Sequence, residues 1–151
     1  MIEKQLTGEE LKWFYKILCK IDFFSEIPLV DIDSITQKFF RESLPTGKVK
    51  IKQGAMSDAL YIIKSGSCTV TRKKGLFAKQ TQVAVLKEGD FFGEMSVLFN
   101  LPAYCSVTTV EPTELFAYLK SDFQKLLDSN SSLRDKVMHI AEIRKYEDLN
   151  K

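Results

Sequence analysis

The stretch GDFFGEMSVLF (residues 89–99) interrupts a series of short strands and decides between the folds open to this chain. After Gly93 the apolar pattern changes to helical spacing for about one turn. Gly93 permits a backbone conformation with positive φ, or a close approach to a ligand. The amides of residues 94–96 would then point outward from a helix N-terminus, where an anion is favoured.

Glu94 leaves two interpretations of this stretch open. A carboxylate would repel a phosphate, but its oxygens can accept hydrogen bonds from a sugar hydroxyl beside that phosphate. The alternative is a plain glycine turn, followed by a glutamate that the helix dipole favours. The first interpretation predicts a phosphate-and-sugar site, and the second predicts only a turn.

Short strands surround this stretch from Val49 to Leu119. Some alternate apolar and polar residues, others are short apolar runs such as LYII (residues 60–63), and glycine-containing turns separate them. Strands spaced about eight to twelve residues apart are typical of sandwiches and barrel-like rolls. The sequence therefore predicts an α+β fold, in which an antiparallel β-roll of the jelly-roll type is flanked by helices.

Helices are predicted before and after the roll. TGEE (residues 7–10) is a candidate capping box, and apolar residues follow at helical spacing over residues 11–19. Pro28 can open a second helix, whose apolar spacing continues over residues 29–39 until Pro45 ends the segment.

Two helices are predicted after the roll. SDFQ (residues 121–124) is a second candidate capping box. The last segment, residues 133–149, has a narrow apolar stripe that needs a partner surface. That stripe contains Leu133, Val137, Ile140 and Ala141. We expect this helix to pack near residues 89–99 as a movable lid.

The chain is expected to form one domain over residues 1–151. Its parts are N-terminal helices in residues 1–46, the roll in residues 47–120 with a ligand cassette at 89–107, and C-terminal helices in residues 121–151. The chain has 44% hydrophobic and 28% charged residues, as is usual for globular proteins.

Charge and composition exclude several classes of function. Lys and Arg number 22 against 20 Asp and Glu, a net charge of +2 that argues against a dedicated nucleic-acid binder. No apolar run approaches the roughly 20 residues that span a bilayer. The first ten residues lack the apolar region of a signal peptide, so we expect a cytoplasmic protein without membrane contact.

Catalytic and metal chemistry are not expected. The chain has one histidine, His139, and three widely spaced cysteines without a CxxC pair. Such a set supplies neither a zinc site nor a disulfide framework. No base is placed beside Cys105 to activate it as a nucleophile. We therefore expect no enzyme activity, no metal and no cofactor.

The order of these motifs resembles the cyclic-nucleotide-binding domain of catabolite activator proteins, cyclic-nucleotide-dependent kinases and gated channels. The resemblance covers residues 47–123. The segments that carry it are KQG (52–54), LYIIKSG (60–66), GDFFGEMSVL (89–98) and LFAYLKSDF (115–123).

The resemblance implies a phosphate-binding cassette between two strands of the roll. Gly93 and the amides of residues 94–96 would face the cyclic phosphate of cAMP or cGMP, and Glu94 would hold the ribose 2′-hydroxyl. The strand around Val83 and Val85 would touch the base. The implied ligand-binding residues are Phe92, Gly93, Glu94, Met95, Ser96, Ala103, Tyr104, Cys105, Val83 and Val85.

One position departs from the family pattern. Tightly binding members usually carry an arginine nine residues after this glutamate, where it pairs with the phosphate, and here that residue is Ala103. The next position, often Thr, Ser or Ala, is the larger Tyr104. A hydrogen bond to a charged group contributes about 1.5–3 kcal/mol, so its loss implies binding weakened by roughly ten- to several-hundredfold.

Three functions remain as hypotheses. The first is a cyclic-nucleotide sensor or regulatory domain in signal transduction, with weakened or altered ligand binding, whose C-terminal helix acts on an unidentified effector protein or domain. The second is a ligand-free protein-interaction module on the same scaffold. The third, a DNA-binding regulator, needs a helix-turn-helix after the roll, where the two predicted helices already occupy the chain.

Overall fold

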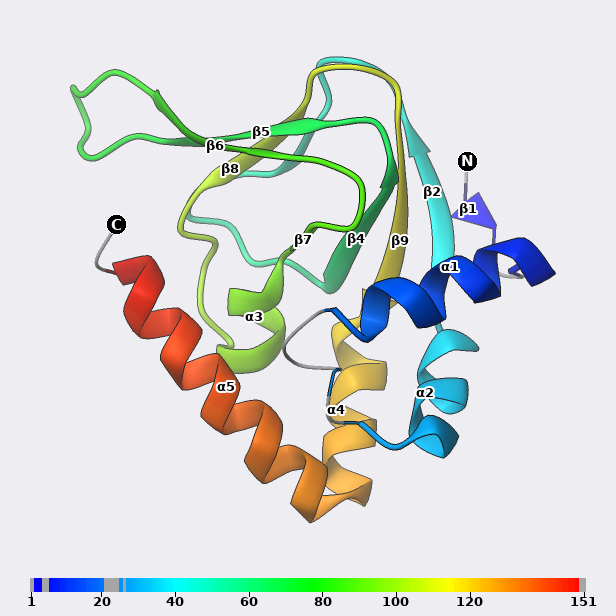
Figure 1. Ribbon diagram of the computed structural model, residues 1–151. Coiled ribbons are helices and arrows are strands. Elements are labelled where there is room, and N and C mark those ends of the chain that lie inside the picture. The colour runs from blue at the N-terminus through cyan, green and yellow to red at the C-terminus, as the bar shows by residue number, and fades with distance from the viewer. Residues whose placement is uncertain (1, 4–5, 21–24, 26, 150–151) are drawn as a thin grey trace.

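The computed structural model describes residues 2–3, 6–20, 25 and 27–149 (Figure 1). The helices are α1 (Gly8–Leu18), α2 (Leu29–Thr36), α3 (Glu94–Phe99), α4 (Lys120–Ser129) and α5 (Ser131–Leu149). The strands are β1 (Ile2–Glu3), β2 (Phe40–Leu44), β3 (Val49–Ile51), β4 (Ala59–Ser65), β5 (Cys68–Arg72), β6 (Thr81–Leu86), β7 (Phe91–Phe92), β8 (Ser106–Thr109) and β9 (Thr113–Leu119).

The strands form two antiparallel sheets. One has the order β1-β2-β9-β4-β7 and the other the order β3-β8-β5-β6. Figure 1 shows the helices gathered at one end of these sheets, while the β5–β6 hairpin extends away from the body of the molecule. The predicted antiparallel β-roll with flanking helices is confirmed.

The core divides between the two faces of the β4–β9 pair. Phe116 and Tyr118 of β9 are buried against the helices, where Phe14 of α1 packs 4.3 Å from the Phe116 ring, centroid to centroid. Leu115 of β9 and Ile63 of β4 are buried among residues of both sheets. Because both faces of these strands are covered, β9 forms a nearly continuous buried apolar run.

The capping box at the start of α1 is confirmed. The Thr7 amide donates to Glu10 Oε1 at 2.9 Å, and the Glu10 amide donates to Thr7 Oγ1 at 3.2 Å. The Glu10 carboxylate also pairs with Arg41 of β2 at 2.5 Å and with Lys64 of β4 at 3.2 Å. Glu10 of the capping box thus ties α1 to the five-stranded sheet.

Two predicted helix boundaries were wrong. The second helix ends at Thr36, and β2 occupies part of the segment predicted to be helical. All five β2 residues pair with β9, a partner about 75 residues distant that local helical spacing cannot reveal. The helix α4 begins at Lys120 without a side-chain cap, so residues 121–124 do not form a capping box.

The helix α5 contacts both α3 and α4, as expected for a helix that packs near residues 89–99. Leu133 and Val137 are buried in the core that the other helices share. The side chains of Ile140 and Ala141 lie outside the described part of the structure. Movement of α5 as a lid stays a prediction.

Candidate ligand-binding site

Gly93 shapes the predicted cassette through its contact with β4. Its φ is +91°, and a Cβ at this position would lie 2.5 Å from the Ala59 carbonyl oxygen. Both features exclude larger residues, since the left-handed backbone conformation favours glycine and a Cβ atom would clash with the Ala59 carbonyl oxygen. The close approach is therefore to the protein's own backbone, and it places α3 directly after β7.

Ser96 ties α3 to the chain around it. Its side chain is buried, and its Oγ accepts a hydrogen bond from the Ser57 amide at 2.9 Å. The same Oγ donates to the Leu101 carbonyl oxygen at 2.7 Å. Ser96 thus holds both the loop before β4 and the loop after α3.

The loop after α3 is held by its backbone at Ala103. The Ala103 amide donates to the Ala55 carbonyl oxygen at 2.7 Å, and the Gly54 amide donates to the Ala103 carbonyl oxygen at 2.8 Å. These bonds fix the position from which the side chains of Ala103 and Tyr104 project.

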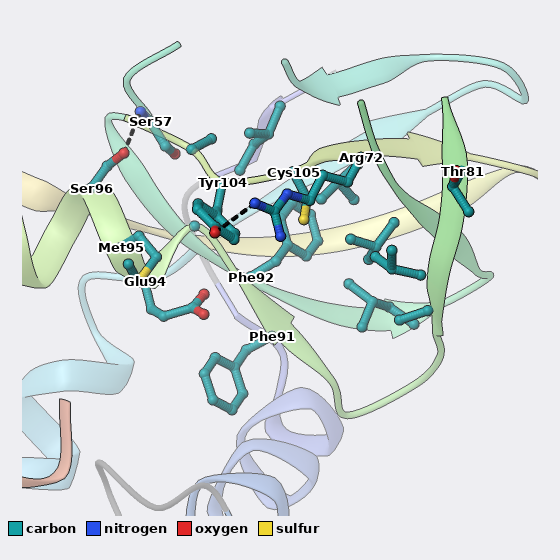
Figure 2. Close-up of a pocket in the computed structure, with 18 of the residues that line it drawn as sticks. Ser57, Arg72, Thr81, Phe91, Phe92, Glu94, Met95, Ser96, Tyr104 and Cys105 are labelled. Atoms are coloured by element: carbon teal, nitrogen blue, oxygen red, sulfur yellow. Dashed lines mark hydrogen bonds between the residues drawn. The ribbon is translucent and has the colours of Figure 1, made fainter. Parts of the chain in front are cut away.

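A cavity of about 460 Å³ lies between α3, β6 and the loop after α3. This volume falls in the range of small-molecule sites. In Figure 2 the Glu94 carboxylate points into the cavity from α3. Among the predicted binding residues, those that line it are Val83, Phe92, Gly93, Glu94, Met95, Ser96, Ala103, Tyr104 and Cys105.

Val85 does not line this cavity. A β-bulge pairs Val70 with Ala84 but Thr71 with Gln82, so Val83 lies at the irregularity and the alternation of β6 changes there. Ala84 and Leu86 line the cavity, and Val85 lies on the opposite face with 44% of its surface exposed. The structure thus brings Val83 to the cavity but not Val85, because the bulge breaks the alternation that would place these two residues on one side.

Arg72 is a cavity residue that the sequence analysis did not assign to the site. Its guanidinium carbon lies 3.8 Å from the centroid of the Tyr104 ring, and Nη2 donates to Tyr104 Oη at 2.5 Å. Figure 2 shows this pair among the residues that line the cavity, which also include Glu94. The alternation of β5, which puts Arg72 on the same side as Cys68 and Val70, was the available signal.

The charges at the cavity wall favour an anion. Its charged residues are Arg72, Lys74 and Glu94, a formal charge of +1. A guanidinium stacked on an aromatic ring keeps further N–H donors in its plane. The wall therefore offers a cation for an anionic group and a carboxylate for hydroxyl groups.

The described residues hold no group of three or more His, Cys, Asp or Glu side chains placed to bind a metal ion. Burial raises the pKa of the Cys68 thiol to about 11, so this thiol stays protonated at neutral pH. In the described part of the chain, no helix is both long and apolar enough to cross a membrane.

A protein kinase and a protein kinase regulatory subunit are among the relatives in sequence. A cGMP-dependent protein kinase of Eimeria tenella is 31% identical over 110 residues, covering 73% of this chain and 10% of that protein. A cAMP-dependent protein kinase regulatory subunit of Yarrowia lipolytica is 32% identical over 111 residues, covering 70% of this chain and 28% of that protein. The chain thus spans less than a third of either relative.

Solved structures share the fold. The regulatory domain of Toxoplasma gondii PKA, crystallised with cAMP, matches with a TM-score of 0.76 and 21% identity over 82% of this chain and 46% of that one. The Thermus thermophilus catabolite activator protein matches with a TM-score of 0.71 and 29% identity, over 86% of this chain and 61% of that one. The model of the cyclic nucleotide-binding domain matches residues 41–130. With more than half of its length matched, the chain belongs to the cyclic nucleotide-binding domain family.

Proposed function

We propose that this chain is a non-catalytic regulatory domain that binds cAMP or cGMP in the cavity beside α3. The observation that carries the proposal is the cavity itself. In a chain of this family, it gathers Glu94, the β7–α3 turn and the loop at Ala103 around one space of suitable volume. Glu94 would accept hydrogen bonds from ribose hydroxyls.

The ligand preference is proposed to be altered at positions 103 and 104. Ala103 projects no cation, and it packs against the apolar cluster inside the roll. Tyr104 fills space at the wall and stacks on Arg72. The phosphate of a cyclic nucleotide would therefore not meet the guanidinium that an arginine at position 103 would provide.

Signalling is proposed to pass from α3 to α5. Ligand bound at Glu94 would contact the first turn of α3, and α3 contacts α5. Ligand can shift the position of α5 only if it makes different contacts in two arrangements of these helices. The effector would then be a protein or domain that distinguishes those arrangements of α5.

Calorimetric titration with cAMP and with cGMP tests the proposal. We expect saturable heat with at least one of them, and about a tenfold or larger loss of affinity in Glu94→Ala, because a hydrogen bond to a charged group is removed. Glu9→Ala is the matched control, since Glu9 is exposed on α1 and is not among the residues that line the cavity. Equal affinities for both variants would contradict the assignment of Glu94.

The β5–β6 hairpin favours the ligand-free interaction module as the second candidate function. Leu76 is 81% exposed and Phe77 is 96% exposed at the end of this hairpin. Exposed apolar side chains on a projecting element are typical of contacts with another protein. This function would take the place of the first if neither cyclic nucleotide gives heat at millimolar concentration, with the wild type or with Ala103→Arg combined with Tyr104→Ala.

A further inference from the structure

We propose that Arg72 of β5, oriented by Tyr104, binds the anionic group of the ligand in place of a cation on the loop after α3. The inference rests on the proposed function, because it names the residue that would hold the cyclic phosphate. It follows from the ion pairs of the described residues, from the way Arg72 is held and from its place in the lining of the same cavity as Glu94.

Arg72 differs from three other partly buried cations, Arg41, Lys50 and Lys64, in lacking a carboxylate partner. Lys120 also lacks one and donates to Asn100 Oδ1, but it does not line the cavity. Arg41 pairs with Glu10, Lys50 with Glu42, and Lys64 with both Glu10 and Glu114. Among the described residues, no acidic side chain lies within ion-pair distance of Arg72, whose one side-chain hydrogen bond is to the Tyr104 hydroxyl. A partly buried guanidinium next to a cavity is stabilised when an anion pairs with it.

Arg72 is held in place from both ends. Next to it, the Lys73 amide donates to Gln53 Oε1 at 2.8 Å, and Gln53 Nε2 donates to the Lys73 carbonyl oxygen at 2.8 Å. At the far end of the side chain, Tyr104 provides the aromatic face and the hydroxyl. A guanidinium restrained in this way loses little conformational freedom when it binds a ligand.

Tyr104 is therefore a positioning residue for Arg72, and the neighbouring Ala103 brings no charged group to the cavity. A phosphate oxygen can accept hydrogen bonds from two N–H groups of one guanidinium, which makes such pairs specific as well as strong. Glu94 lines the same cavity, and its carboxylate would accept hydrogen bonds from the hydroxyl groups of the same ligand.

The test compares charged and uncharged ligands on matched variants. Arg72→Gln should weaken binding of cAMP or cGMP by about ten- to a hundredfold. Adenosine and guanosine, which lack the phosphate, should bind the variant and the wild type alike. Lys79→Gln removes the same charge from an exposed position on the same hairpin, and it should leave all affinities unchanged.

Arg72→Lys is the second variant, and urea unfolding establishes that each variant is folded. Arg72→Lys should lose less affinity for the cyclic nucleotide than Arg72→Gln, because lysine keeps the positive charge although it lacks the planar N–H donors. If both variants unfold, Arg72 is structural and the proposal is overturned.

The remaining outcomes separate this inference from the proposed function. If Arg72→Gln binds the cyclic nucleotide as tightly as Lys79→Gln, the inference is wrong while the proposed function stands. If the variant loses affinity for the nucleoside and for the cyclic nucleotide equally, Arg72 shapes the cavity rather than binding the phosphate. That result also overturns the inference. If the wild type binds neither cyclic nucleotide, both proposals fail.

Discussion

Phe116→Ala should lower the free energy of unfolding by about 3–5 kcal/mol, because it removes a fully buried ring and leaves a cavity. Phe116 is 0% exposed, and its ring centroid lies 4.3 Å from that of Phe14 and 5.5 Å from that of Trp13. The strand carrying it pairs with β2 on one side and β4 on the other, so the surrounding backbone has little freedom to collapse. The loss is a large part of the roughly 5–15 kcal/mol that stabilises a domain.

Phe77→Ala is the matched control for this prediction. It removes the same side chain at a position that is 96% exposed, so the change should stay within about 0.5 kcal/mol. Urea unfolding followed by circular dichroism measures both variants, with comparable slopes required for the comparison. Similar losses in the two variants would contradict the packing described around β9.

The protein should become less stable as the pH falls below about 5, because protonation of the Glu10 carboxylate weakens its ion pairs. Burial alone would raise the pKa of this carboxyl, but hydrogen bonds from Thr7, Lys64 and Arg41 outweigh it and lower the pKa from 4.5 to about 2. The folded state therefore releases this proton more readily than the unfolded state. Its stabilisation is present above the unfolded pKa and is lost as the pH falls toward 2, up to about 3 kcal/mol.

Glu10→Gln separates this effect from the general effect of acid. Urea unfolding between pH 7 and pH 3 should show the variant less stable than Glu9→Gln at pH 7, with the difference narrowing as the pH falls. Glu9 is the matched control, since it lies next to Glu10 but is exposed. If the stability profiles of the two variants run parallel over this range, the Glu10 ion pairs do not contribute as described.

The sequence predicts most of the fold because its decisive signals are local. The spacing of the short strands and the helical turn after Gly93 each depend on a few adjacent residues. β2 was missed because its stability comes from pairing with β9, and the helical spacing of residues 29–39 gives no sign that a strand begins at residue 40. Such long-range pairing overrides local propensity and leaves little trace in the segment itself.

The site was predictable where it is continuous in sequence and not where it depends on distant pairs. Residues 92–96 and 103–105 all line the cavity, as their proximity along the chain suggested. Arg72 and Tyr104 are 32 residues apart, and only the packing of β5 against the loop after α3 brings them together. Val85 lies outside the cavity lining because a single bulge changes which side chains of β6 face the cavity.

Nuclear magnetic resonance titration of the labelled protein with cAMP and with cGMP tests most directly whether this cavity binds a cyclic nucleotide. The amide signals of residues 93–96, Arg72 and Tyr104 should move with a common saturation curve, while those of Leu76 and Phe77 at the hairpin end stay in place. No movement at millimolar nucleotide, or movement confined to residues outside the cavity lining, would contradict the proposal.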